Sequence, residues 1–455
     1  MKSIHKWAAG AAIVALSFAA PGFAESNQED EATNAALRSE VEDLRERLAR
    51  LEQLLMDKLS ADEEEQPAQA SAAAPVTAAV PAKAPMKVRF GQARPAIPGA
   101  PTDAESHEDA VVGPVSTGGP SLSFTGLIDT YYSYNTNKPE DGTNALYYTN
   151  PNARGFGLNQ AKLELDAQTS SGVGFRSDIW FGSGARLFRD GLEPGPLEDV
   201  IYLQQAYGYY TWENGTELDV GLFGTIAGLE VAESHLNWNY SRGLLWAWNE
   251  PFSHLGAKLS TPITDTFTAT ALLVNGFDNA FDQNQGKSYG GQGSWAPSDQ
   301  FNTTFTWIHG PENGIMEDGW QRNASWNFYA GLHPKFEIMG NFDYISNTDP
   351  TDVTATSWGL GGYARYNATD KFKIASRYEY FDDSEARSTG VENILKEYTL
   401  TFEYAPEPRF ITRFEYRRDW STVDFFGCTD CRASGLSSDQ DTFTVGLMWV
   451  LGPVE

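Results

Sequence analysis

Charged side chains recur at every second position in several segments of this chain, the spacing that places them on one face of a β-strand. The acidic set lies in the first segments with this alternation and consists of Asp129, Glu164, Asp166 and Asp178. The basic set lies in later segments and consists of Arg365, Lys373, Arg377, Arg413 and Arg417. Facing each other across a water-filled interior, the two sets would produce a transverse field that orders water and favours polar solutes.

The alternative is that the charges within each set neutralise one another. Glu379 and Glu415 share the basic segments, and Lys162 and Arg176 share the acidic ones. Opposite charges attract most strongly at short range, and such pairing would leave little field across the interior. The sequence leaves both interpretations open.

A long segment without strand periodicity, residues 228–252, combines aromatic side chains with both signs of charge. These residues are Glu230, Glu233, Trp238, Tyr240, Arg242, Trp246, Trp248 and Glu250. Folded into the interior of a barrel, the segment would form a pore constriction with aromatic walls. The alternative is an external flap or a contact loop between subunits, because aromatic residues also anchor interfaces.

The remaining chemical motif is Cys-x-x-Cys at Cys428 and Cys431. Zinc needs further ligands, and none follows at a suitable spacing, so the pair predicts a local disulfide that pins a loop. The 6 histidines are scattered, and neither Gly-x-Ser-x-Gly nor His-Glu-x-x-His occurs. We therefore expect no enzyme, no metal site and no cofactor.

The segments that carry the charged residues alternate with a period of two from Ser121 onward. In the first of them Leu122, Phe124 and Ile128 fall on one face, while Ser123 and Asp129 fall on the other. The pattern predicts about sixteen strands at residues 121–136, 155–168, 173–182, 200–212, 216–227, 253–261, 266–276, 288–295, 300–309, 321–332, 336–345, 356–366, 371–381, 393–404, 409–420 and 441–451.

The connections between these segments alternate between tight and long. The tight ones are 169–172, 213–215, 262–265, 296–299, 333–335, 367–370 and 405–408. A soluble β-sandwich has no reason to sort its loops in this way, whereas a transmembrane barrel has short turns at one rim and long loops at the other. We therefore predict an all-β fold, a transmembrane antiparallel β-barrel over residues 121–455. Its tight turns and C-terminus are expected in the periplasm.

The N-terminal part has three zones. Residues 1–24 are typical of a secretory signal peptide, because Lys2 and Lys6 precede an apolar stretch and a small-x-small cleavage site. Residues 34–59 predict a short periplasmic helix with the 3.5-residue period of a coiled coil. Residues 60–120 are rich in Ala and Pro and predict a flexible, disordered linker.

The predicted helix also carries a signature of its oligomeric state. Arg47 and Glu52 fit the Arg-h-x-x-h-Glu pattern of trimeric coiled coils, in which the arginine pairs with a glutamate on the neighbouring helix. This pattern predicts a homotrimer. The alternative is a single solvated helix, which would be marginally stable at about three heptads.

Composition narrows the function classes. A net charge of −28 argues against nucleic acid as a partner. A mean hydropathy of −0.41 argues against a bundle of membrane helices, and 13% aromatic residues fit the girdles of a membrane barrel. The predicted outside loops are rich in Asp and Glu, which would favour cations at the mouth or bind divalent cations that bridge to lipopolysaccharide. Alternatively, these acids only keep the surface soluble.

The barrel region resembles a known family. The stretches that carry the resemblance are residues 126–132, 205–207, 221–225, 228–230, 237–242, 251–256 and 275–278. Asn-Tyr-Ser-Arg at 239–242 and Pro-Phe-x-His-x-Gly at 251–256 are the most specific. Together they resemble the putative β-barrel porin-2 (OmpL-like) family of bacterial outer-membrane porins, which implies a passive channel. The chain departs from many such barrels because it ends without a terminal aromatic residue.

The leading hypothesis is an outer-membrane porin for passive diffusion of ions and small hydrophilic solutes. Its expected surroundings are outer-membrane lipid, lipopolysaccharide and, near the N-terminal segment, peptidoglycan. One alternative is a structural envelope tether whose pore is incidental. Another is an outer-membrane lipid hydrolase.

Overall fold

The computed structural model describes residues 121–185, 201–278, 284, 286–313, 316–429, 431 and 434–452. The predicted signal peptide, coiled-coil helix and linker lie outside these residues. No helix among the described residues is long and apolar enough to cross a membrane.

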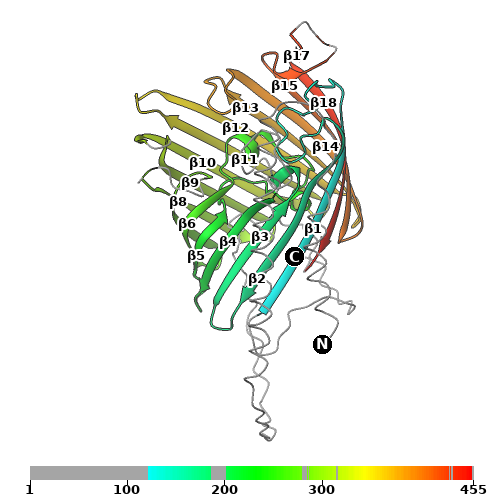
Figure 1. The fold of residues 1–455 in the computed structure, drawn as a ribbon. Helices are drawn as coiled ribbons and strands as arrows, with labels where there is room; N and C mark the ends of the chain where they lie inside the picture. The colour runs from blue at the N-terminus through cyan, green and yellow to red at the C-terminus, as the bar shows by residue number, and fades with distance from the viewer. Residues whose placement is uncertain are drawn as a thin grey trace, which may run out of the picture. The chain divides into compact units, whose positions relative to one another are not determined.

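Sixteen antiparallel strands form one closed barrel (Figure 1). They are β1 (Ser121–Asn135), β2 (Arg154–Gln168), β3 (Val173–Phe181), β4 (Ile201–Thr211), β5 (Glu217–Gly224), β6 (Ser253–Thr264), β7 (Phe267–Val274), β8 (Ser288–Ser298), β9 (Phe301–Asn313), β10 (Met316–His333), β11 (Phe336–Thr348), β12 (Thr354–Asn367), β13 (Phe372–Asp383), β14 (Asn393–Glu407), β15 (Phe410–Ser421) and β18 (Asp439–Leu451). The first strand closes the barrel by pairing with both β2 and β18. The predicted barrel fold is confirmed.

The period of two in the sequence sorts side chains between the two faces of the barrel wall. In β1 the side chains of Asp129, Tyr131 and Ser133 are buried, whereas Tyr132 and Tyr134 between and after them are exposed. The outward positions of the other strands are likewise occupied by exposed Leu, Phe, Tyr and Trp side chains. A barrel wall with an apolar outer face suits a lipid environment.

Three predicted strand boundaries are wrong at the long-loop rim: the end of β5, the end of β9 and the start of β10. The connection at residues 310–320 was expected to be a long loop. Instead β9 continues to Asn313 and β10 begins at Met316, because Trp320 and Gln321 extend the ladder opposite Pro311 and Gly310. The fifth strand ends at Gly224 rather than at residue 227, because Thr225 turns away and its N–H bonds to the carbonyl of Phe252.

The last long loop contains a small hairpin that the sequence pattern did not predict. It consists of β16 (Phe426–Gly427) and β17 (Leu436–Ser437). Cys428, at its edge, is disulfide-bonded to Cys431. In Figure 1 β17 lies at the upper end of the barrel, and the tight turn between β2 and β3 lies at the lower end. Tight turns and long loops therefore occupy opposite rims.

Candidate functional site: a loop folded across the barrel interior

Residues 225–252, which connect β5 to β6, fold into the barrel and contact its inner wall on several sides. The loop contains a 3-10 helix, η2 (Ser234–Leu236), and a short α-helix, α4 (Leu244–Trp248). Most of its residues are buried; the more accessible ones are Val231, His235, Leu236, Trp248 and Phe252. It is therefore packed against the wall along nearly all its length.

The loop first contacts the wall formed by β8, β9 and β10. The carbonyl of Ile226 accepts hydrogen bonds from Gln292 (2.5 Å) and Thr306 (3.2 Å). The carbonyl of Gly228 accepts one from Asn327 at 2.8 Å. Wall side chains thus satisfy backbone groups that have no partner in a strand or helix of their own.

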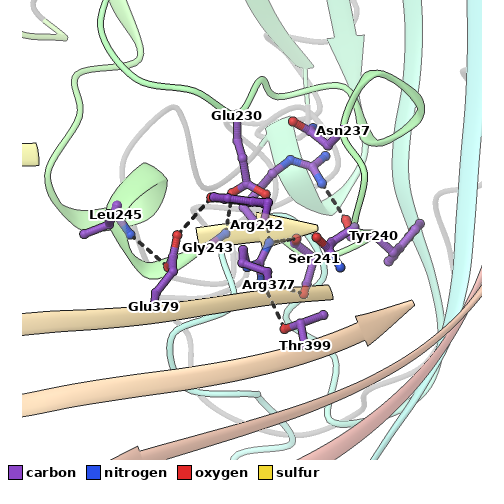
Figure 2. Close-up of polar contacts among 12 residues, drawn as sticks. Glu230, Asn237, Tyr240, Ser241, Arg242, Gly243, Leu245, Arg377, Glu379 and Thr399 are labelled. Carbon is purple, nitrogen blue, oxygen red and sulfur yellow. Dashed lines mark hydrogen bonds and ion pairs between the residues drawn. The ribbon is translucent and has the colours of Figure 1, made fainter. Parts of the chain in front are cut away.

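The loop then reaches β13, where Arg377 holds it at two points (Figure 2). The Arg377 Nη1 atom donates to Glu230 Oε1 and to the carbonyl of Ser241, each at 2.7 Å. The Nε atom of the same guanidinium donates to Glu397 of β14 at 2.7 Å. One wall arginine therefore joins two separate stretches of the loop to each other and to the barrel.

Two further arginines, both on β15, hold the loop through its backbone. Arg413 donates to the carbonyls of Ser234 and Asn237, each at 2.6 Å. Arg417 donates to the carbonyl of Arg242 at 2.6 Å. Because guanidinium presents five donors in a planar fork, it can bind carbonyl groups and a carboxylate together.

Beyond β18, which lies next to β15 in the barrel, the loop contacts β1 and β2. Asp129 accepts hydrogen bonds from Ser234 Oγ (2.5 Å) and from the Tyr240 hydroxyl (2.7 Å). Lys162 donates to Glu233 at 2.5 Å. Burial alone would raise the pKa of Glu233, but the Lys162 ammonium outweighs it and lowers that pKa to about 2. Glu233 is therefore ionised at neutral pH.

The geometry of the loop depends on glycine at two turns. Gly228 has φ +86°, and a Cβ atom there would lie 1.6 Å from Glu250 Oε2. A Cβ atom on Gly243 would lie 2.2 Å from Glu379 Oε1. Glu379 accepts from the backbone N–H of Leu244 at the start of α4. It also accepts from the backbone N–H of Leu245 at 3.3 Å (Figure 2). Both turns bring the backbone against a carboxylate, which a side chain would prevent.

Apolar contacts cover α4 from the long-loop side. Leu244 and Leu245 pack in one buried cluster with Leu146 of the β1–β2 loop and Phe426 of β16. Tyr147, next to Leu146, stacks beneath the Arg417 guanidinium at 4.5 Å. The β1–β2 loop and the loop that contains β16 therefore hold residues 225–252, the inward loop, in place from the long-loop rim.

The predicted constriction residues lie inside the barrel, but their aromatic rings do not form open walls. Trp238, Tyr240 and Trp246 are 3%, 0% and 2% exposed. They pack against the wall and within the loop, as Trp238 does against Arg365 (4.5 Å) and Tyr329 (6.5 Å between ring centres). The expectation of aromatic walls facing solute is corrected: these rings attach the loop.

The predicted basic wall residues are all paired with carboxylates at short range. The pairs are Arg365–Glu337 (2.8 Å), Lys373–Glu403 (3.2 Å), Arg377–Glu230 (2.7 Å), Arg413–Glu403 (2.7 Å) and Arg417–Asp419 (2.6 Å). These contacts neutralise the set locally, so an unscreened transverse field does not describe this interior. The alternative interpretation fits better, although Glu379 and Glu415, named as its partners, bind loop N–H groups instead.

Among the predicted acidic wall residues, Asp178 and Glu164 show the same local ion pairing. Asp178 lies 2.9 Å from Lys162 and 3.0 Å from Arg176. Glu164 lies 2.6 Å from Arg176. Asp166 accepts a hydrogen bond from the Tyr209 hydroxyl at 3.1 Å, and Asp129 accepts one from the Tyr240 hydroxyl of the loop. The acidic and basic sets therefore do not form two oppositely charged walls.

Sequence reasoning missed the carboxylates that neutralise the basic wall. Glu337, Glu397, Glu403 and Asp419 are buried inward-facing residues on β11, β14 and β15. Their positions have the same parity as other inward residues of those strands, so the alternation could have identified them. Among the described residues, no group of three His, Cys, Asp or Glu side chains is arranged to hold a metal ion.

A closed sixteen-strand barrel with an apolar outer face and a polar interior defines the class: a transmembrane β-barrel of the porin type. Residues 121–451 match the family described as putative beta-barrel porin-2, OmpL-like, and the chain belongs to that family. It is thus an outer-membrane channel. A family of porins lends no support to the lipid hydrolase alternative.

Solved structures share the fold at low sequence identity. The anion-selective porin from Comamonas acidovorans is 11% identical, with a TM-score of 0.52, over 73% of this chain and 99% of that one. The outer membrane channel DcaP of Acinetobacter baumannii is 10% identical, with a TM-score of 0.52, over 75% and 100%. Salmonella typhi OmpF, in complex with daunomycin, is 12% identical, with a TM-score of 0.51, over 73% and 98%. No curated protein sequence matches the chain.

Proposed function

We propose that the chain is a porin through which ions and small hydrophilic solutes diffuse passively, with residues 225–252 as its constriction. The observation that carries the proposal is the path of this loop. It is hydrogen-bonded to β8–β10 through Ile226 and Gly228, to β13 through Glu230, and to β1–β2 through Ser234 and Glu233. A sixteen-strand lumen is too wide to be narrowed by wall side chains alone, so a loop across it sets the size limit.

The polar interior supports hydrophilic rather than apolar solutes. At the tight-turn end, inward side chains such as Glu164 and Arg176 are 25% and 14% exposed and form ion pairs. Paired charges and hydroxyl groups replace part of a solute's hydration without binding it permanently. Passage needs this balance, because a solute must both enter and leave.

The test is electrical and osmotic. Purified full-length protein reconstituted in planar bilayers should give discrete conductance steps, and liposomes containing it should swell in sugars up to a size limit. Deletion of residues 229–243 should raise both the conductance and the size limit. An intact, folded barrel that neither conducts nor admits sugars would contradict the proposal.

The same proposal includes an assembly and an orientation. The coiled-coil pattern at 34–59 supports a homotrimer with this helix, the tight turns and the C-terminus in the periplasm, and with lipopolysaccharide around the outer rim. Conductance steps in threes, and loss of chemically cross-linked trimers after deletion of residues 25–120, are expected. An external protease should cleave the long loops in intact cells and leave the tight turns uncut.

A structural envelope tether is the second candidate, and the N-terminal sequence favours it specifically. A linker of about sixty residues with Pro-rich character spans on the order of 100 Å, enough to carry the helix toward peptidoglycan. Deletion of residues 25–120 separates the two functions. A porin keeps its conductance after this deletion, whereas a tether loses its effect on envelope integrity.

A further inference from the structure

Basic side chains lie on the outer face of the barrel, near the long-loop ends of their strands. They are Arg154 of β2, Arg322 of β10, Lys396 of β14 and Arg418 of β15. Arg154 and Arg322 are exposed, and Lys396 and Arg418 are half-buried. Their direction follows from the alternation along each strand, because the residues beside Arg322, Lys396 and Arg418 are buried and face inward, and Arg154 lies opposite the exposed Tyr134.

These outward cations differ from the basic residues of the interior in their partners. Each predicted basic residue of the inner wall has a carboxylate within hydrogen-bond range, and so does Arg418, which contacts Asp439 and Asp441. Arg154, Arg322 and Lys396 have no ion pair with any described residue. Arg322 donates only to Thr348 Oγ1, at 3.4 Å, so its charge is not compensated there.

Lys396 also lacks a compensating acid, although an acid lies nearby. Asp382 faces outward on β13, diagonal to Lys396 in the ladder, and it accepts a hydrogen bond from the Tyr380 hydroxyl at 3.2 Å. The Lys396 ammonium lies 5.8 Å from the centre of the Tyr380 ring. A cation held over an aromatic face keeps its positive charge available to a further partner.

The three uncompensated cations mark the edge of the apolar band on the outer face. Toward the tight turns, the next outward residues on the same strands are apolar or aromatic, among them Phe156, Leu158, Trp326, Tyr398 and Phe402. About ten residues separate Arg322 from the tight turn after β10, which is about 25 Å along the barrel axis for a strand tilted by about 40°. The apolar band of such barrels is also about 25 Å tall.

Aromatic rings accompany each of these cations, as expected at a membrane interface. Arg154 lies opposite Tyr134 in the ladder, and Arg322 lies opposite His309. The His309 ring stacks between Trp307, at 5.4 Å between ring centres, and Trp320, at 4.5 Å. The cations therefore lie at the level where lipid head groups begin.

We propose that Arg154, Arg322 and Lys396 form an outer cation belt that binds the phosphate groups of lipopolysaccharide. In the orientation of the proposed porin, on which this inference rests, the long-loop rim faces outward. The lipid leaflet there carries phosphorylated glucosamine head groups. Arginine and lysine form strong, charge-assisted hydrogen bonds to phosphate, and the adjoining rings can pack against the sugar faces.

The experiment measures binding of fluorescent lipopolysaccharide to purified full-length protein in non-ionic detergent, at low salt and without divalent cations. The triple variant Arg154→Gln/Arg322→Gln/Lys396→Gln should bind it at least about fivefold more weakly, the usual contribution of one cation beside an anionic lipid. The matched control, Lys335→Gln/Lys371→Gln/Arg409→Gln, removes the same charge at the tight-turn rim and should keep the wild-type affinity. Lipopolysaccharide stripped of its phosphates should bind wild type and the first variant equally weakly.

The outcomes separate this inference from the proposed function, because binding is measured without using conductance. Folding of each variant is checked by its heat-modifiable migration. Equal affinity of the two triple variants would overturn the belt while a normal ion current leaves the porin standing. Equal binding of phosphorylated and dephosphorylated lipid would assign the contact to acyl chains and also overturn it.

Two further outcomes would contradict the belt. Wild-type binding that appears only after magnesium is added would assign the phosphates to divalent cations on the acidic long loops. Loss of cross-linked trimers from the first variant, in the absence of lipopolysaccharide, would assign the cations to contacts between copies of the chain. A folded wild-type barrel without ion current would contradict the porin instead.

Discussion

Arg377 of β13 and Glu230 of the inward loop form a 2.7 Å ion pair in which the two side chains are 0% and 3% exposed. Glu230 also accepts from the backbone N–H of Gly243 at 2.6 Å. The pair therefore joins two separate stretches of the loop, at Glu230 and Gly243, to one position of the barrel wall. Its loss should free the loop rather than unfold the barrel.

Glu230→Gln should loosen the constriction. Arg377 keeps Glu397 as a counter-charge, so the loss is that of one charged hydrogen bond between the wall and the loop, about 2 kcal/mol. We expect larger and noisier single-channel currents together with a lower unfolding temperature in detergent. Arg418→Gln is the control: its exposed partners Asp439 and Asp441 lie outside the interior, and the change should cost less than about 1 kcal/mol. Equal current noise in both variants would contradict the role given to Glu230.

Gly228→Ala should destabilise the loop for two separable reasons. The backbone has φ +86°, which costs an L-residue about 1–2 kcal/mol, and the new Cβ would overlap Glu250. The double variant Gly228→Ala/Glu250→Ala relieves the overlap but keeps the backbone strain. Thermal unfolding should rank wild type above the double variant and the double variant above Gly228→Ala. A single variant as stable as wild type would show that the loop adapts at this turn.

The alternation of the sequence predicts which residues face the interior, but not which of them meet. Arg413 and Glu415 share a strand face, yet Arg413 pairs with Glu403 because these two lie directly opposite in the ladder between β14 and β15. That register depends on turn geometry and strand stagger, which single-segment periodicity does not contain.

The loop was harder to predict than the wall. Residues 225–252 have no period, so the sequence indicates that Glu230 and Arg242 belong to a functional segment without placing either one. Arg242 turns out to brace the loop internally, through the carbonyls of Val231 and Ala232, each at 2.7 Å. The aromatic residues predicted to line the pore instead pack against the barrel wall and within the loop, because apolar rings in a polar lumen are most stable when they are packed.

The Glu233–Lys162 contact predicts acid sensitivity of the loop. The pKa of Glu233 is about 2 in the folded protein against an ordinary 4.5. Its stabilisation, about 3 kcal/mol, is therefore complete above pH 4.5 and lost as the pH falls through 2. Glu233→Gln should lack this part of the pH dependence when unfolding is measured between pH 5 and 2. Parallel curves for the variant and wild type would argue against an ionised Glu233.

Glu403 offers the sharpest test of how local pairing sets ion selectivity. Its carboxylate lies 3.2 Å from Lys373 and 2.7 Å from Arg413, and the side chains of Lys373 and Glu403 are 14% and 10% exposed. Glu403→Gln would leave two cations unbalanced at the tight-turn end of the lumen, which raises the local anion concentration. We expect the reversal potential in a potassium chloride gradient to shift toward chloride, most strongly at low ionic strength. Glu385→Gln, which removes an exposed acid that binds Thr356, is the control and should leave the potential near the wild-type value. An unchanged potential in Glu403→Gln would mean that permeating ions do not pass this carboxylate.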